Sequence, residues 1–223
     1  MKHRKGKSFY LKITLPTLLT IVLFVASLFL IIVPLVESQL LLLKKKMIRE
    51  LTNSAWSILE DQYNHEKEGR LTRSEAQESA IRTIRSMRYG EERKDYFWII
   101  DTGPKMIMHP YRDDLKNVDL QEYTDSHQKK LFREFVATAK DFGDGFVDYH
   151  WQWQDDPSRV VPKISYIKAF APWNWIIGTG IYLDDIEKEI GAMKNNIIKI
   201  SFFITLLISL MLLYITRESL ACG

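Results

Sequence analysis

Two uncharged apolar runs, residues 15–36 and 200–216, stand on either side of a long polar segment. The first has 22 residues, and a helix rising about 1.5 Å per residue would make it roughly 33 Å long, enough for a hydrocarbon core of about 30 Å. The second has 17 residues, but Lys199 can extend toward the headgroups and residues 197–198 can lengthen the helix. The layout predicts a chain that crosses a membrane twice, with its folded part outside the membrane.

Each run has an alternative interpretation. A basic N-terminus ahead of an apolar stretch is also the pattern of a signal peptide. The first run is longer than a usual signal-peptide core, however, and no small-x-small cleavage site follows Val36. These features favour an uncleaved anchor. The alternative for the second run is a buried core helix.

The charges around the first run predict its orientation. Five Lys or Arg residues and no Asp or Glu precede Leu15, and an excess of basic residues favours the cytoplasmic side. Lys44, Lys45, Lys46 and Arg49 are basic on the other side, but long domains are translocated largely regardless of charge. The expected division is a cytoplasmic N-terminus (1–14), a first transmembrane helix (15–36), an external domain (37–196, core about 40–190), a second transmembrane helix (197–216) and a short cytoplasmic tail (217–223).

The external domain is mildly acidic and has no cysteine. Residues 37–196 hold 24 Lys or Arg against 27 Asp or Glu, a net charge of −3, so a nucleic-acid partner is not expected. The only cysteine is Cys222. The domain therefore has no disulfide and no thiolate metal ligand, and its hydrophobic core must hold it together.

Periodicity and turn residues predict an α+β domain. Apolar residues at helical spacing predict a helix from Glu37 to about Tyr63, and the capping box Thr72–Glu75 begins a second helix that ends near Met87. Runs of aromatic and β-branched residues, divided by turn residues, predict two hairpin strands (96–100 and 105–109) and, later, three further strands (146–153, 160–170 and 175–183). Between these two groups of strands, helical spacing predicts a connecting helix (125–140). This order predicts a five-stranded antiparallel sheet backed by helices. From Leu183, helical spacing leads into the second run without a linker.

Several sequence blocks occur together in order. They are Arg88-Tyr89-Gly90, Asp95-Tyr96-Phe97-Trp98-Ile99, residues 104–110, residues 145–151, residues 162–166 and residues 173–182. With these blocks, residues 40–190 resemble the single Cache domain, second subtype, of bacterial membrane receptors. One departure is Gln128, where that family usually has glycine, in a turn before the connecting helix. A second is that such receptors continue into a kinase, methyl-accepting or cyclase output, whereas this sequence ends at Gly223.

The resemblance implies a PAS-like sheet that holds a small organic acid, in a two-pass protein of the bacterial cytoplasmic (inner) membrane. A buried carboxylate needs cationic, N–H or O–H donors within an apolar wall. The candidate ligand-binding residues are Arg88, Tyr96, Trp98, His109, Tyr149, Trp151, Lys163 and Tyr166. Lys163 and Tyr166 lie on opposite faces of a regular strand, so both reach a ligand only if Pro162 causes a bulge or bend. No cofactor, metal or catalytic residue is expected.

Other functions for these residues remain open. Trp98 and Trp151 suit a hydrophobic core as well as a pocket wall, His109 suits a structural hydrogen bond, and Arg88 can cap the second helix. Enzymatic chemistry is disfavoured, because the sequence has no metal-ligand spacing, P-loop, nucleophile elbow or kinase motif. Besides a sensor and an enzyme, a third possible function is that of a membrane adaptor whose sheet binds no small molecule. A closed polar and aromatic cavity would distinguish a sensor from such an adaptor.

The apolar stripe Leu40, Leu43, Met47 and Leu51 suggests assembly as well as membrane attachment. Its period suits a pair of parallel helices in a homodimer, so the expected partners are a second copy of the chain and membrane lipid. We therefore expect the ligand-sensing input region of a bacterial signal-transduction receptor. Because no output module follows in this sequence, the chain either pairs with a full-length partner or is a non-signalling truncation, and the second is favoured.

The orientation can be tested by labelling. A cysteine introduced by Asp155→Cys should react with a membrane-impermeant thiol reagent in intact cells, after permeabilisation of any outer membrane, because residue 155 lies in the external domain. Cys222 should stay unlabelled until the cytoplasmic membrane is opened. The reverse labelling pattern would refute the predicted topology.

Overall fold

The computed structural model describes the backbone of residues 2–221 and the side chains of residues 14–215, 217 and 218. In chain order the elements are α1 (Lys2–Ser27), the π-helix η1 (Leu28–Ile32), α2 (Val33–Lys67), α3 (Arg73–Ser86), β1 (Phe97–Asp101), β2 (Met106–Met108), η2 (Asp113–Leu115), α4 (Leu131–Phe142), β3 (Asp144–Trp153), β4 (Asp156–Phe170), η3 (Ala171–Trp173), β5 (Trp175–Tyr182) and α5 (Leu183–Ala221). Cys222, which is expected in the cytoplasmic tail, lies outside the described residues.

The chain divides into two compact units. One contains residues 2–40 and 187–221, and the other is the domain of residues 41–186. The first unit is helical, and Lys194 forms an ion pair with Glu37 at 2.6 Å within it. Two helical segments, Thr14–Lys67 and Leu183–Ile215, are long and apolar enough to cross a membrane.

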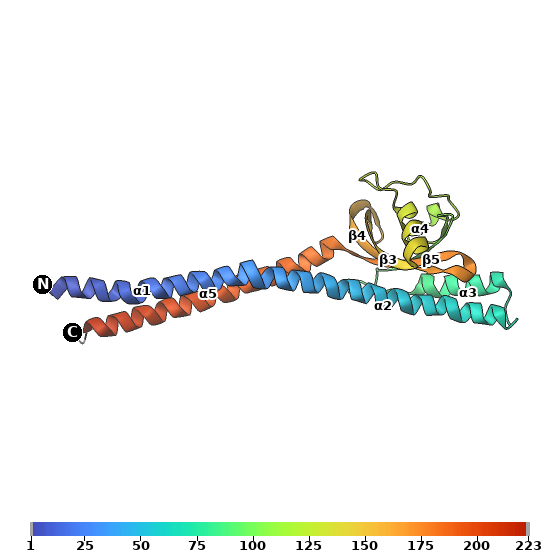
Figure 1. Ribbon diagram of the computed structural model, residues 1–223. Helices are drawn as coiled ribbons and strands as arrows, with labels where there is room; N and C mark the ends of the chain where they lie inside the picture. Colours follow the sequence, from blue (N-terminus) through green and yellow to red (C-terminus); the bar gives the residue numbers. More distant parts are fainter. Residues whose placement is uncertain (1, 222–223) are drawn as a thin grey trace. The chain divides into compact units, whose positions relative to one another are not determined.

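The domain is built on an antiparallel five-stranded sheet with strand order β2-β1-β5-β4-β3. α4 packs on one face of the sheet, while α3 and the domain's part of α2 cover the other (Figure 1). Each face has its own hydrophobic core. The predicted α+β, PAS-like architecture, a five-stranded antiparallel sheet with a long N-terminal helix, is therefore confirmed.

Strand alternation assigns the side chains to the two cores. On β1, Trp98 and Ile100 belong to the core under α4, whereas Phe97 and Ile99 belong to the core under α2 and α3. β5 is buried along its whole length because both faces of this central strand are covered. The sequence blocks rich in aromatic residues thus supply two cores from the same strands.

Gly178 gives the Trp98 indole its place. The two residues are directly paired across β1 and β5. A Cβ atom at position 178 would come within 2.5 Å of the Trp98 ring. Because residue 178 has no side chain, the indole can lie over β5, on the face of the sheet that α4 covers.

The connecting helix begins later than predicted, at Leu131 and not at Asp125. The Asp125 carboxylate accepts hydrogen bonds from the backbone N–H groups of His127 (2.8 Å) and Lys129 (2.9 Å). This local bonding stabilises a turn in competition with the helix. Within the turn Gln128 has φ +62°, a backbone conformation that glycine adopts most easily.

α2 meets the sheet along only part of its surface. Ile48, Thr52 and Ala55 are fully buried, whereas Leu43 and Met47 are 63% and 38% exposed. The Lys45 ammonium lies 5.3 Å from the Phe146 ring centroid and so is on the sheet side of the helix. An apolar strip on α2 therefore remains uncovered within the domain.

This strip allows a test of the expected homodimer. Single cysteine substitutions at Leu43 and Met47 should each give cross-linked dimers in membranes, because a parallel partner helix would bring equivalent positions together. The matched control is a cysteine at Lys45, which should not cross-link. Equal cross-linking at all three positions, or at none, would contradict a parallel dimer along this helix.

Candidate functional site

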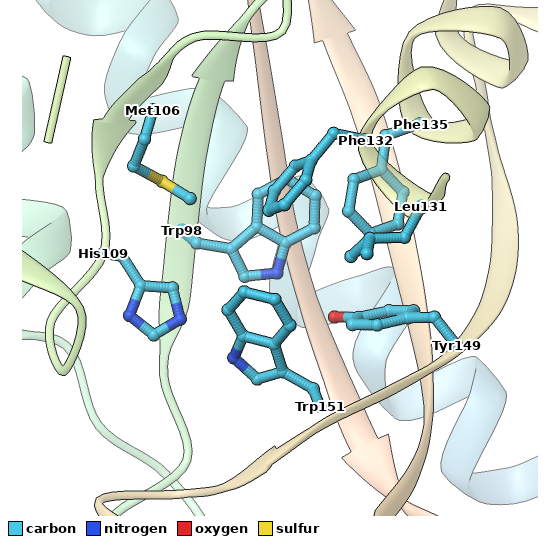
Figure 2. Close-up of a pocket in the computed structure, with 8 residues that line it drawn as sticks. All are labelled: Trp98, Met106, His109, Leu131, Phe132, Phe135, Tyr149 and Trp151. Atoms are coloured by element: carbon cyan, nitrogen blue, oxygen red, sulfur yellow. The ribbon is translucent and has the colours of Figure 1, made fainter. Parts of the chain in front are cut away.

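A small cavity lies between the sheet and α4. It is lined by Trp98, Met106, His109, Leu131, Phe132, Phe135, Tyr149 and Trp151 (Figure 2). Its volume is about 10 Å³, which is at the lower limit for one water molecule. The wall is mostly aromatic and includes polar groups from four side chains: the indole N–H groups of Trp98 and Trp151, the His109 imidazole and the Tyr149 hydroxyl.

His109 contributes a buried donor with no partner. His109 comes directly after β2 in the sequence and is 3% exposed. Burial, and then the nearby charge of Lys163, hold the pKa of the imidazole well below its ordinary value, so the ring is neutral. Its Nδ1 accepts a hydrogen bond from the Tyr111 N–H at 3.2 Å, which leaves the proton on Nε2. That Nε2 atom has no hydrogen-bond partner among the described residues.

Trp98 contributes a second such donor. Its ring stacks on Phe135 with centroids 4.7 Å apart. Figure 2 shows the indole nitrogen turned toward the middle of the surrounding side chains. Within the described part of the chain, this buried N–H makes no hydrogen bond of normal geometry, and it interacts weakly with the Tyr149 hydroxyl, whose pKa it lowers. Unpaired buried donors are rare in native proteins, and each costs about 1–3 kcal/mol.

The Tyr149 hydroxyl also faces the middle of the cavity (Figure 2). It forms a hydrogen bond with the Ser165 hydroxyl at 2.8 Å, in which either oxygen can donate. Burial raises the pKa of Tyr149 above its ordinary value, so the phenol stays protonated. Tyr149 can therefore offer its proton either to Ser165 or to a group inside the cavity.

Lys163 is buried beside the cavity without lining it. The residue is 1% exposed, and its ammonium donates to the hydroxyls of Tyr96 (3.0 Å) and Tyr182 (3.2 Å). The Nζ atom also lies 4.1 Å and 4.4 Å from the centroids of these two rings. Burial lowers the pKa of Lys163 to about 7, opposed by the charge of Asp95. Tyr96 connects the ammonium to the cavity wall, because its ring centroid is 4.7 Å from that of His109.

The structure brings six of the eight predicted residues together. Trp98, His109, Tyr149 and Trp151 line the cavity, and Tyr96 and Lys163 lie beside it.

The other two predicted residues lie elsewhere. β4 keeps a regular register past Pro162, so Tyr166 faces α2, where its ring is 5.2 Å from the Arg49 guanidinium. The bulge or bend at Pro162 that would let Lys163 and Tyr166 reach one ligand does not form, and the two side chains lie on opposite faces of β4. Arg88 donates to the backbone carbonyls of Arg85 (2.6 Å) and Met87 (2.7 Å), which is the helix-capping role.

Sequence reasoning missed several members of the cavity wall. They are Met106, Leu131, Phe132 and Phe135, together with Tyr182 and Ser165 next to the site. The apolar spacing of residues 131–135 was a usable signal, because a helix that covers a sheet directs this face at it. For Tyr182 no local signal exists, since its pairing with Lys163 depends on the register of β4 and β5. Among the described residues, no group of three or more potential metal ligands comes together.

Comparison with known proteins identifies the family of this chain. The family model dCache_2, described as Cache domain, matches residues 34–202. The chain belongs to the Cache domain family. The sequence resemblance indicated the single form of this domain, and the described residues hold one five-stranded sheet.

Two relatives are receptors of different kinds. The methyl-accepting chemotaxis protein McpP of Pseudomonas putida is 37% identical over 175 residues, covering 78% of this chain and 32% of McpP. The sensor histidine kinase MctS of Rhizobium johnstonii is 32% identical over 176 residues, covering 77% of this chain and 36% of MctS. The chain thus spans about a third of the length of these curated relatives.

Two solved structures share the fold of the domain. One is a periplasmic sensor domain of a chemotaxis protein, with 37% identity, a TM-score of 0.61 and coverage of 64% of this chain and 96% of that one. The other comes from work on carboxylic acid recognition by a Cache chemosensory domain, with 36% identity, a TM-score of 0.61 and coverage of 65% and 97%. The chain is therefore similar to two chemosensory domains, one of which is described as periplasmic.

Proposed function

We propose that this chain is the ligand-sensing input region of a bacterial transmembrane receptor and that its Cache domain binds a short-chain carboxylate. One observation carries the proposal. Two buried N–H donors, from Trp98 and His109, make no hydrogen bond of normal geometry among the described residues, and they line one cavity beside the buried ammonium of Lys163.

A carboxylate meets the chemistry of this cavity. Its two oxygens can accept the unpaired N–H groups, and its negative charge is attracted by Lys163. Its short alkyl part fits a wall made of aromatic rings and Met106. A cationic ligand would be repelled by the positive charge of Lys163, and an apolar ligand would leave the N–H donors of Trp98 and His109 unpaired. The relationship to a Cache domain studied for carboxylic acid recognition supports the same ligand class.

The small volume of the cavity favours a second candidate, a membrane adaptor with no small-molecule ligand. A cavity of about 10 Å³ cannot hold even acetate without rearrangement. The unpaired donors argue for the sensor, because an adaptor would gain stability by replacing them with apolar side chains. The two candidates differ in whether carboxylates bind.

Our proposal for the whole chain follows the sequence interpretation. Residues 15–36 and 197–216 cross the cytoplasmic membrane, the domain lies outside it, and both termini are cytoplasmic. Homodimers form along α2. In one respect the proposal departs from the sequence interpretation, which favoured a non-signalling truncation: we propose that an output module reads the signal, because the chain spans only about a third of the length of its curated relatives. The two candidate spans and the periplasmic sensor domain among the solved relatives support this arrangement.

A binding experiment on a Lys163 variant tests the function. The full chain in lipid nanodiscs should bind at least one of acetate, propionate and butyrate by calorimetry. Lys163→Met should weaken that binding by about 2–5 kcal/mol, roughly 30-fold or more, because the bound anion loses its cationic partner. The melting temperature without ligand should stay the same or rise, since the variant removes a buried charge. No binding of any small carboxylate to wild type would leave the adaptor as the function.

The pH dependence provides a second test. In the ligand-free protein the pKa of Lys163 is about 7, and a bound anion would raise this pKa. Above pH 7, binding must therefore take up a proton, and the affinity should fall by up to tenfold per pH unit. Below pH 7 the affinity should level off, because the lysine is already charged. Calorimetry at pH 6, 7, 8 and 9 in buffers of different ionisation enthalpy measures both effects.

Two variants assign the titration. Lys163→Met should abolish the dependence on pH. Burial also raises the pKa of Asp95, but Asp95 should not be the source of the pH dependence. In the Asp95→Asn variant the affinity should therefore still fall as the pH rises above 7. A wild-type affinity that is constant from pH 7 to 9 would contradict the role given to Lys163.

A further inference from the structure

A second hollow, lined in part by exposed side chains such as Asp114, lies next to the cavity, whose own lining residues are all buried. This groove has a volume of about 570 Å³ and runs between the loop after β2 and the hairpin of β3 and β4. Its lining includes Tyr111, Arg112, Asp114, Tyr123, Trp151 and Gln152. The groove therefore has ample space for a small organic acid, which the closed cavity does not.

Trp151 is the one residue that lines both hollows in the described part of the chain. Its indole therefore separates the groove from the cavity. The Arg112 guanidinium carbon lies 5.6 Å from the Trp151 ring centroid, and the Tyr123 ring lies 5.8 Å from it. Movement of this one side chain would connect the two spaces.

We propose that the groove is the access route of the carboxylate, that Arg112 captures the anion there, and that Trp151 is the gate to the cavity. This inference rests on the proposed function, because it assumes that a carboxylate is the ligand. It adds a capture site and a residue that determines the rate of binding.

Arg112 is suited to capture an anion. Among the described residues that line the groove, it is the only lysine or arginine. Its guanidinium donates to both carboxylate oxygens of Asp114, each at 2.8 Å. Hydrogen bonding to Asp114 raises the pKa of Arg112, so its charge is permanent. The fork that holds Asp114 has the geometry that binds any carboxylate.

Asp114 can give up its place to the ligand. Its side chain is 62% exposed, and an ion pair at such an exposed position contributes little to stability. Exchange of one carboxylate for another on the same guanidinium is therefore cheap. The other carboxylate of the groove, Asp125, is 1% exposed at its side chain and accepts backbone N–H groups from His127, Lys129 and His150. It is committed to the turn and does not compete for Arg112.

Kinetics separate capture from final binding. A charge at the rim of a site changes the association rate and its dependence on salt, whereas a buried partner changes the dissociation rate. Stopped-flow measurement of tryptophan fluorescence on the full chain in nanodiscs, with acetate, propionate and butyrate as probes, gives both rates. Arg112→Gln should slow association about tenfold and weaken its salt dependence. Its dissociation rate should stay within about twofold of wild type.

Three further variants sharpen the test. Asp114→Asn should speed association, because it removes the competing carboxylate. Arg112→Lys should retain most of the wild-type rate, which also controls for misfolding. Arg82→Gln alters an exposed arginine of α3 that lines a different hollow, and it should change neither rate.

The outcomes distinguish this inference from the function on which it rests. If wild type binds a probe and Arg112→Gln leaves association unchanged, or alters dissociation alone, the access route is refuted while the carboxylate sensor stands. If wild type binds none of the three probes, both are refuted.

Discussion

The site depends on the burial of one ammonium group, that of Lys163. Transferring a charge out of water is costly, and this one is held by two tyrosine hydroxyls and the faces of their rings, without a carboxylate in hydrogen-bonding contact among the described residues. The Asp95 carboxylate acts only through its field. The neighbourhood is therefore positive whenever the lysine is charged. Burial, and then the field of this lysine, lower the pKa of His109 and keep it neutral. A buried positive region with unpaired N–H donors is prepared for an anion.

Tyr182 links this ammonium to the end of the sheet. Its hydroxyl accepts from Lys163 and from the Gln154 N–H (2.8 Å), and it donates to the Gln152 carbonyl (3.1 Å). Tyr182 is the last residue of β5, and α5 begins at the next residue. The tip of the β3–β4 hairpin also holds the first turn of α5, because Arg159 bonds to Asp184 at 2.8 Å. An anion that draws the ammonium toward the cavity would pull on a hydroxyl shared by the sheet, the hairpin and the start of this helix. The contacts between site and helix are therefore short.

Much of the fold could be predicted from the sequence because its signals are local. The capping box of Thr72 and Glu75 forms as expected, and period-two patterns gave the strands. The start of α4 could not be predicted from helical spacing, since the Asp125 carboxylate bonds to backbone groups that a helix would need. The candidate site shows the same contrast between local signals, which the sequence reveals, and contacts that depend on the whole fold. Alternation predicted that Lys163 and Tyr166 lie on opposite faces of a regular strand, as they do, whereas the pairing of Lys163 with Tyr182 depends on a strand register that local sequence does not encode.

The closed cavity has a thermodynamic consequence for a sensor. In the closed state two N–H donors stay unpaired, at a cost of about 1–3 kcal/mol each. A state that is open to the groove hydrates these donors but separates the rings of Trp151, Phe132 and Tyr123, which now contact each other. Opening would thus exchange the polar cost of the unpaired donors for the loss of contacts between aromatic rings. On the proposed function, a carboxylate would relieve the polar cost in a filled, closed site, so part of its binding energy would go into changing the conformation and the rest into affinity. An empty cavity that was already large would bind more tightly, but it would leave the protein with little change to transmit.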